Sequence, residues 1–272
     1  MNSAAASGMR IITLMTDFGL EDGYVASMKG VILGIFPTAV LVDVSHLVPP
    51  QDICAGAFLL ATVYRHFPAG TVHLVVVDPG VGTSRRGLVV TGGDYCFVGP
   101  DNGLFSWVLQ EESEWQAYSL DNPCYRRAEV SSTFHGRDIF APAAAHLLAG
   151  VPAGAFGAPC TPIAADWSRV VRGTQRMSGV VIHIDHFGNV ITNLRDRDVQ
   201  CMSAGEGLLL TIGPHRVTRF IDTYAEAEPG EPAALIGSSG FLEIAVNRGN
   251  AAERLRANRG ETVVLMPWGL AD

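Results

Sequence analysis

Cysteine, basic residues and long apolar runs are all scarce in this chain. Its 272 residues include five cysteines at wide spacings with no CxxC pair. This odd count disfavours a disulfide framework or a zinc site and favours a reducing, cytoplasmic environment. Lysine and arginine number 19 against 27 acidic residues, for a net charge of −8. That balance disfavours nucleic acid and anionic membranes as partners, and no apolar run reaches the roughly 18–20 residues of a membrane span.

Motifs for common cofactors are missing as well. The sequence contains no Walker loop and no GxGxxG, HxH or HExxH spacing, so we expect no metal and no cofactor. Five side chains that could reach one rim of the predicted sheet keep a metal in view as a minor alternative. They are Asp17, Asp43, His46, Asp78 and His135.

The first half of the chain alternates apolar runs with segments of helical periodicity. Buried strands are expected at 10–15, 39–44 and 72–77, and helices at 21–36 and 50–67. Such alternation predicts right-handed βαβ crossovers and a three-layer α/β/α sandwich with a mostly parallel sheet.

Acidic residues follow these strands and open the helices. Asp17, Asp43 and Asp78 lie at or near the strand ends, and the carboxyl ends of parallel strands share the rim where open α/β sheets bind ligands. Acids are expected in the first turn of the first helix, and Pro50 and Asp52 in the first turn of the second.

A change of composition divides the chain. A hairpin and two further helices complete an α/β domain of residues 10–151, preceded by a disordered leader, 1–9. Residues 152–176, rich in Gly, Pro and Ala, predict a linker. Short strands at hairpin spacing in 177–272 predict an all-β barrel domain. These later elements are the hairpin strands 88–91 and 95–98 around Gly92-Gly93, the helices 104–110 and 139–149, and the strands 178–185, 208–212, 215–219, 233–236, 241–246 and 262–267.

Three residues form the candidate reactive set. Asp78 ends a buried strand, Arg85 follows it around a glycine-rich loop, and His135 lies in a polar loop before a helix. Together they could hold a small oxygen nucleophile and move its proton. An Asp–Arg pair that pins a turn, beside a histidine satisfied in its own loop, explains the same residues. Arg86 is expected at the surface.

Asp17 and Asp22 are candidates for the other end of a ligand. A carboxylate at the end of the first strand, such as Asp17, can accept hydrogen bonds from ribose hydroxyls, or it can cap the following helix. Asp22 is more often a first-turn acid that complements the helix dipole.

Two runs stand out in the β domain. In IDHFGNVITN, Asp185 and Asn189 bracket a tight turn with Phe187 near its tip. An amide can read the edge of a purine and an aromatic ring can stack on it, although turn chemistry is the commoner explanation. In GSSGFLEIAVN, Ser238 and Ser239 form a glycine turn whose backbone could contact a ligand, or they are plain turn residues.

Several ordered segments together resemble the S-adenosyl-L-methionine (SAM) hydroxide adenosyltransferase family, whose relatives fluorinate or chlorinate the same substrate. The resemblance runs from about residue 11 to 267. Its segments are TDFGLEDGYVASMKG, VDVSHLVPPQDI, VVVDPGVGTSRR, VGPDNGLF, TFHGRDIFAPAAAHL, IDHFGNVITN and SSGFLEIAVNRGNA. It implies a homotrimer in which each ligand lies between the sandwich of one subunit and the barrel of its neighbour.

The resemblance also implies roles. Asp78, Arg85 and His135 match the reactive triad of the hydroxide-using branch, and Asp17 would hold the ribose hydroxyls. The methionine end would be bound by Asp185 and Asp22, and adenine by Asn189, the Ser238–Ser239 turn and the backbone near Val246 and Asn247. Phe187 and Glu243 complete the substrate-binding candidates.

Three departures separate this chain from the halogenating relatives. Those relatives carry tyrosine at the position of Asp78, the fluorinating branch has an insertion where this chain has Gly92-Gly93, and Pro50 replaces a halide-pocket tryptophan. The resemblance therefore implies hydrolysis of SAM to adenosine and L-methionine, with Asp78 or His135 as the base. A halide-dependent synthase and a non-catalytic adenosine or SAM sensor are the alternatives.

Overall fold

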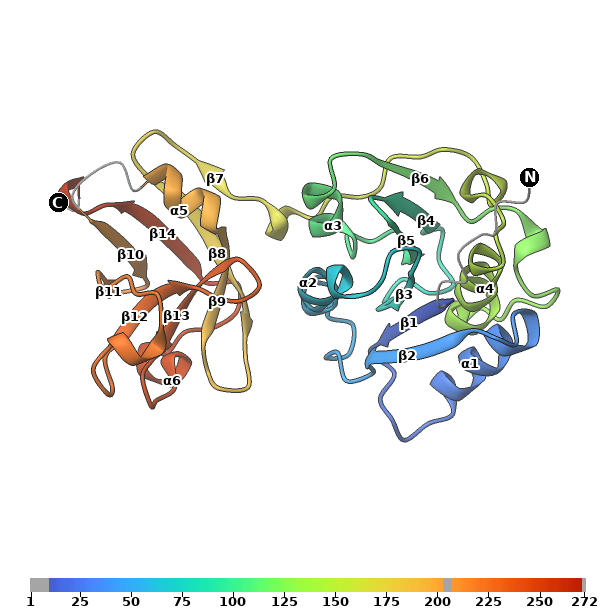
Figure 1. Cartoon of the computed structure of the whole chain (residues 1–272), viewed down its shortest axis with the longest axis horizontal. Coiled ribbons are helices and arrows are strands. Elements are labelled where there is room, and N and C mark those ends of the chain that lie inside the picture. Colours follow the sequence, from blue (N-terminus) through green and yellow to red (C-terminus); the bar gives the residue numbers. More distant parts are fainter. Residues whose placement is uncertain (1–9, 203–206, 271–272) are drawn as a thin grey trace, which may run out of the picture. The chain divides into compact units, whose positions relative to one another are not determined.

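The computed structural model describes residues 10–202 and 207–270, so the predicted leader lies outside the described residues. The chain divides into two compact units, the first ending at Ala165 and the second beginning at Asp166. Each unit is built around its own sheet (Figure 1). In the described part of the chain, no helix has both the length and the apolar character needed to cross a bilayer.

The first unit contains a six-stranded mixed sheet in the order β2-β1-β3-β5-β4-β6. Four neighbouring strands run parallel, and β4 and β6 add antiparallel pairs at one side. The parallel crossovers and the hairpin expected from the sequence are confirmed, whereas β6 was not predicted. The strands are β1 (Ile11–Thr16), β2 (Val40–Ser45), β3 (Val72–Val76), β4 (Gly87–Gly92), β5 (Tyr95–Pro100) and β6 (Trp115–Ser119).

The prediction that the second strand is buried is wrong. Strand β2 forms one edge of the sheet, with Val40 and Asp43 exposed and its other residues partly covered. A short apolar run resembles a central strand whether or not a neighbour pairs with its second side. Only the order of the strands decides this.

Helix starts also differ from the expectation. Helix α1 (Tyr24–Ile35) follows Gly23 and has no acid in its first turn, so Asp22 precedes it. Helix α2 (Ile53–Val63) begins after Asp52, whose carboxylate accepts a hydrogen bond from the Ala55 amide at 2.9 Å. Asp52 is therefore the N-cap rather than a first-turn residue, as a short acceptor side chain at that position favours.

Different side chains cover the two faces of this sheet. On one face, Leu14 and Leu74 pack with Met28 of α1 and with Ala144 of helix α4 (Ala141–Leu148). On the other, the buried ring of His73 stacks on Phe97 at 5.2 Å in an aromatic cluster that includes Tyr64. Helix α3 (Ser106–Glu111) contacts α2, and Figure 1 shows these two helices away from α1 and α4.

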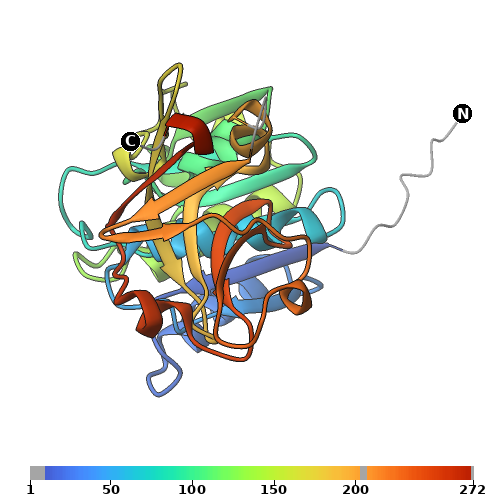
Figure 2. The same cartoon turned by 90° about the vertical axis from the view of Figure 1, so that its left-hand side faces the viewer.

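The second unit is an antiparallel sheet that nearly closes on itself. Its strands follow the order β11-β10-β14-β8-β9-β13-β12, and a bridge between Phe220 and Ala234 brings the chain after β11 to β12. Figure 2 views this unit from its own end. The strands are β7 (Val171–Arg172, paired with β8), β8 (Met177–Ile184), β9 (Val190–Arg195), β10 (Leu208–Ile212), β11 (His215–Val217), β12 (Pro232–Ile236), β13 (Phe241–Val246) and β14 (Thr262–Pro267), with helices α5 (Asp196–Met202) and α6 (Ala251–Leu255).

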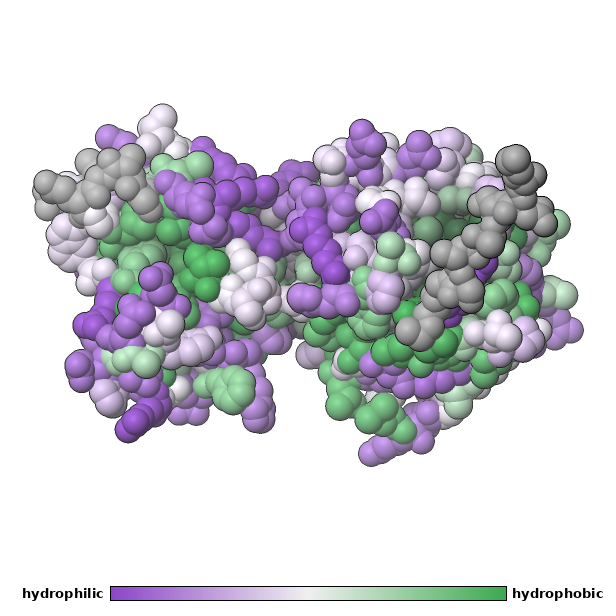
Figure 3. Space-filling model, in the orientation of Figure 1, coloured by the Kyte–Doolittle hydropathy of each residue, from purple (hydrophilic) through white to green (hydrophobic). Residues whose placement is uncertain are grey.

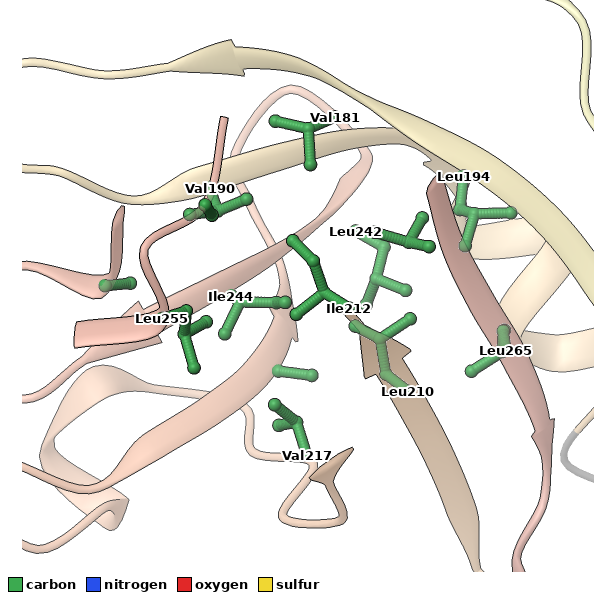
Figure 4. Packing of buried hydrophobic residues seen from close by; sticks show 14 of the residues in the cluster. Val181, Val190, Leu194, Leu210, Ile212, Val217, Leu242, Ile244, Leu255 and Leu265 are labelled. Atoms are coloured by element: carbon green, nitrogen blue, oxygen red, sulfur yellow. The ribbon is translucent and has the colours of Figure 1, made fainter. Parts of the chain in front are cut away.

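Alternating residues of these strands fill the interior of the second unit. Val181, Leu210, Leu242 and Leu265 come from four different strands and meet in one cluster (Figure 4). Burial of such side chains stabilises a unit by about 1.5–3 kcal/mol each. Strand β9 was not predicted, because its residues, VITNLR, mix apolar and polar side chains without strict alternation and directly follow the Asp185–Asn189 turn.

Part of the segment predicted as a linker is bound to the first unit. The buried carboxylate of Asp101 accepts hydrogen bonds from Arg86 Nε at 3.0 Å and from the Ile163 amide at 2.8 Å. Arg86 also donates to the Thr161 carbonyl at 3.0 Å. Arg86 lies at the surface, as expected, but it is paired, and it fastens residues 161–163 to the strand ends.

We expect Asp101→Ala to lower the free energy of unfolding of the first unit by about 1–3 kcal/mol, because it leaves a buried amide without its acceptor. Urea denaturation measures this, and limited proteolysis should show faster cleavage near residues 161–166. The control is Asp166→Ala, since the Asp166 side chain is 96% exposed and 3.5 Å from Arg169; it should change stability by less than about 0.5 kcal/mol. Equal effects of the two substitutions on stability would contradict the role of Asp101 in holding residues 161–163.

Candidate functional site

The predicted reactive residues come together around one guanidinium group. Arg85 Nε donates to Asp78 Oδ1 at 2.8 Å, and Arg85 Nη2 donates to Asp78 Oδ2 and to His135 Nδ1, the latter at 2.8 Å. The side chains of Asp78 and Arg85 are only 4% and 11% exposed. The guanidinium also lies over the ring of Phe140, 5.1 Å from its centre.

The glycine loop after β3 makes this arrangement possible. Gly82 has φ +76°, a conformation that side chains rarely adopt. A Cβ atom there would lie 2.2 Å from the Ser132 carbonyl oxygen. The loop therefore packs directly against the segment that carries His135. This close backbone approach lets two loops distant in sequence meet.

Asp138 is bonded within the loop that carries His135, and it was not predicted from the sequence. It is fully buried, accepts a hydrogen bond from the Ser131 amide at 2.9 Å, and pairs with Arg137 and Arg127. Burial raises the pKa of Asp138, but its hydrogen bonds to Arg137 and Ser131 outweigh this, so the pKa is lowered. A turn of π-helix, Gly136–Phe140, follows at once, and such turns are frequent at functional sites. The Arg-Asp pair directly after His-Gly was the available sequence signal.

The donors around His135 decide where its proton lies. A guanidinium has only donors, so the Nδ1 atom that contacts Arg85 must accept, and the neutral ring then carries its hydrogen on Nε2. Burial and then the charge of Arg85 lower the pKa of His135 below its usual value. The ring is therefore neutral at pH 7.

A cavity of about 390 Å³ opens beside these residues. Asp78 and His135 line it together with three aromatic rings, Phe18, Tyr24 and Phe134. The rings contact one another edge to face, with centres 5.2–5.9 Å apart. The arrangement offers a polar reactive corner in a largely apolar wall, which is typical of small-molecule sites. A second hollow, of about 590 Å³ near Trp115, contains no histidine or arginine.

Asp17 lies close enough to Asp78 to feel its charge, and a backbone amide of the segment before α2 orients its carboxylate. Its Oδ2 atom accepts a hydrogen bond from the Gln51 amide at 2.7 Å. The backbone of Gln51 has φ +64°, which is strained for a residue other than glycine. Burial is the main cause that raises the pKa of Asp17, and the charge of Asp78 raises it further. Asp22 is exposed before α1, and no hydrogen bond of its side chain is described.

In the second unit, the predicted turn forms around Asp185. Its Oδ1 atom accepts from the amides of Phe187 and Asn189, and its Oδ2 atom accepts from the Asn189 side chain, all at 2.9 Å. Phe187 is 74% exposed. The turn chemistry that offered the structural explanation is therefore present, and it leaves the Phe187 ring available for contact.

The remaining candidates are spread along β13. Ser238 and Ser239 precede it beside Arg195, whereas Val246 and Asn247 lie at its far end near Asn189. Six residues of strand span about 16 Å. One adenine ring is too short to touch both ends, so the set suits a longer ligand.

Glu243, in the middle of β13, is a buried carboxylate. Tyr224, which sequence reasoning missed, donates its hydroxyl to Glu243 Oε1 at 2.6 Å while its ring remains 48% exposed. Burial raises the pKa of Glu243, and the charge of Asp185 raises it further against the effect of the Tyr224 bond. The loop between β11 and β12 gave no distinctive signal for Tyr224, because it also contains Phe220 and Ile221.

No group of three or more potential metal ligands occurs among the residues that the structure describes. Of the five side chains considered for a metal, His46 and Asp43 contact each other, with Nε2 and Oδ1 3.0 Å apart, while Asp78 and His135 are both bound to Arg85.

Comparison with protein families places these residues in a known context. Residues 12–157 match the model of the SAM hydroxide adenosyltransferase N-terminal domain, and residues 179–264 match that of the C-terminal domain. The chain belongs to this family. The candidate residues of both units fall inside the matched regions.

Relatives within the family carry two kinds of name. A protein of Thermus thermophilus named (R)-S-adenosyl-L-methionine hydrolase is 40% identical over 95% of this chain and all of its own length. One of Methanocaldococcus jannaschii with the same name is 37% identical over 91% of this chain and 92% of its own. A fluorinase of an Actinoplanes species is 31% identical over 96% and 98% of the two chains.

Two solved structures share the fold. A Thermotoga maritima protein described as uncharacterized and conserved has a TM-score of 0.84 at 34% identity, over 93% of this chain and 99% of its own. A conserved hypothetical protein of Thermus thermophilus has a TM-score of 0.75 at 39% identity, over 95% and 100%.

We expect nitrogen-15 NMR to show that the His135 ring is neutral at pH 7 and carries its hydrogen on Nε2. The ring should become protonated only below pH 6.5, because burial and the charge of Arg85 both oppose a positive charge on it. Arg85→Met should move the titration to higher pH. His73 is the internal control: burial lowers its pKa to about 3, so it should not titrate between pH 5 and 8. A positively charged His135 at pH 7 would contradict the assignment.

Proposed function

We propose that this protein hydrolyses SAM to adenosine and L-methionine by attack of water on the ribose C5′ atom. The observation that carries the proposal is the Arg85 guanidinium shared by a carboxylate and a neutral imidazole at the wall of a cavity. The hydrolase names of relatives at 37–40% identity support it.

The chemistry asks little of the enzyme beyond positioning. Methionine leaves the sulfonium of SAM as a neutral group, so the reaction needs no cofactor. The protein must place a water molecule in line with C5′ and remove the other water molecules that surround it. As water adds, one proton must be removed. A halide carries none, so a site for water differs from a halide site by needing a base.

We propose Asp78 rather than His135 as the acceptor of that proton. The Nδ1 lone pair of His135 is occupied by Arg85, and its Nε2 atom carries a hydrogen. Each oxygen of Asp78 keeps a second lone pair after pairing with Arg85. In this arrangement His135 donates to the water oxygen through Nε2, and the charge of Arg85 stabilises developing hydroxide.

Substrate contacts follow from the two half-sites. Asp17 would accept hydrogen bonds from the ribose hydroxyls, and Asp22 and Asp185 would bind the ammonium end of methionine. In the second unit, Asn189 with the backbone of Val246 and Asn247 would hold adenine.

Further residues of the second unit would contact other parts of the same substrate. The Ser238–Ser239 turn lies too far along β13 to share the adenine ring with Asn189. Phe187 offers an exposed face for stacking and Glu243 a buried acceptor.

We also propose that the protein works as a homotrimer, with each site assembled from the first unit of one chain and the second unit of another. An exposed edge strand and apolar side chains beside it support an interface on the first unit: edge strands present unpaired backbone groups. Figure 3 shows apolar surface near β2 in this unit. The exposed apolar residues on α1, β2 and their loops are Leu20, Tyr24, Leu33, Val40 and Leu47.

The finer architecture and the location of the protein are part of this proposal. Helices on both sides of the first sheet support a three-layer α/β/α sandwich, and the nearly closed second sheet supports a small barrel. All five cysteines are free, which supports a reducing, cytoplasmic location.

We expect Asp78→Asn to lower kcat at least about 100-fold while KM changes less than about threefold, because the amide keeps the shape of the side chain but cannot accept the proton. Product formation by mass spectrometry in ¹⁸O-labelled water measures this, and the label should enter the 5′-hydroxyl of adenosine. The comparison variant is His135→Gln. Full retained activity of Asp78→Asn with loss in His135→Gln would make the histidine the base.

The same assay, repeated with added chloride, tests the alternatives. Formation of 5′-chloro-5′-deoxyadenosine in place of labelled adenosine would identify a halide-dependent synthase. Tight binding of SAM without any product would identify a sensor, and either result would overturn the proposed hydrolysis.

A further inference from the structure

A buried histidine that no proposed step uses lies beneath the loop that carries Asp17. His46 follows β2 and is 3% exposed. Its Nδ1 atom is 2.9 Å from the hydroxyl of Thr16, the last residue of β1, and its backbone carbonyl accepts a hydrogen bond from the Gly19 amide at 2.8 Å. His46 therefore contacts the residue before Asp17 with its side chain and the residue two after it with its backbone.

A charged pair supports His46 from the other side. Its Nε2 atom lies 3.0 Å from Asp43 Oδ1, within ion-pair distance but off the line of a hydrogen bond, and Lys29 of α1 donates to Asp43 Oδ2 at 2.6 Å. Burial raises the pKa of Asp43, but the hydrogen bond and charge of Lys29 and the nearby His46 lower it by more. Asp43 is therefore ionised at neutral pH and favours a ring with hydrogen on Nε2.

Asp43, His46 and Thr16 contact one another in the order carboxylate, imidazole, hydroxyl, which is the order of these groups in catalytic triads. Thr16 is fully buried, however, and its oxygen already accepts a hydrogen bond from the Phe18 amide at 3.2 Å. No substrate carbonyl can reach this hydroxyl, so nucleophilic chemistry is excluded. The chain of contacts can only hold the backbone of residues 16–19 in place.

We propose that His46 is a positioning residue for ribose recognition. Through Thr16 and Gly19 it holds the loop on which Asp17 stands, while the Gln51 amide holds one carboxylate oxygen of Asp17. The other oxygen is then presented to the ribose hydroxyls without further ordering, which reduces the entropy cost of binding. This inference rests on the proposed role of Asp17 and needs no catalytic step.

The chain contains a matched control for this role. His73, on β3, is also fully buried, and its Nδ1 atom is 2.8 Å from the hydroxyl of Thr13 on β1. It stacks in the aromatic cluster around Phe97 and holds no loop at the strand ends. A purely structural effect of deleting a buried histidine should be the same at both positions.

The test is calorimetric binding of adenosine and of 2′,3′-dideoxyadenosine, which lacks the ribose hydroxyls that Asp17 would bind. We expect His46→Ala to weaken adenosine binding about tenfold and dideoxyadenosine binding less than about threefold, the scale of one charge-assisted hydrogen bond. His46→Asn, which keeps a polar atom near the Nδ1 position, should recover part of the loss. His73→Ala should lose stability but leave the ratio of the two affinities at its wild-type value.

Two results would overturn the inference: equal weakening of both nucleosides by His46→Ala, or the same change in their affinity ratio in His73→Ala. If His46→Ala does not fold, Asp43→Asn replaces it, because the Asp43 side chain is 43% exposed and tolerates the change. An affinity ratio that stays at the wild-type value in both Asp43→Asn and His46→Asn would then overturn the inference. A wild-type protein that prefers adenosine but does not hydrolyse SAM would reject the proposed function and leave this inference standing.

Discussion

The arrangement of the first unit's site depends on one buried guanidinium. Arg85 contacts both Asp78 and His135, and it can do so because a planar fork offers several donors at fixed angles. A lysine would present a point charge and could not hold a carboxylate and an imidazole in the same plane. By binding Nδ1, the guanidinium also leaves Nε2 as the nitrogen of neutral His135 that carries the hydrogen. The proposed division of labour between base and donor follows from that single contact.

Around this group, the backbone makes the necessary approach possible. Gly82 lets the loop after β3 touch the segment before α4, and Asp138 holds that segment from behind with backbone and arginine partners. The carboxylate of Asp17 is likewise held by the amide of Gln51, a residue with a strained backbone. The loop that carries Asp17 is held by the contact between His46 and Thr16. In each case a backbone amide takes part in holding a charged side chain. Such preorganisation is what a reaction limited by placement and desolvation requires.

The second unit follows a different rule. Its core is formed by alternating apolar residues of a nearly closed sheet, while the predicted ligand contacts lie along β13, at its two ends and in the turn after β8. Glu243 is buried there and accepts a hydrogen bond from the hydroxyl of Tyr224, which is 48% exposed. Glu243 was already predicted from the sequence, whereas Tyr224 is connected with the predicted residues only by this contact.

The sequence by itself determined which chemical groups are available and in which order they occur. The apolar runs, the glycine loop and the ordered motifs identified the parallel strands, the candidate reactive residues and the family, because these depend on local periodicity and on residue identity. Only the tertiary structure decided that β2 is an edge strand, that Tyr224 donates to Glu243, and that Arg85 takes the Nδ1 lone pair of His135. Those facts depend on contacts between residues far apart in the chain, such as the 50 positions between Arg85 and His135, and no local pattern encodes them.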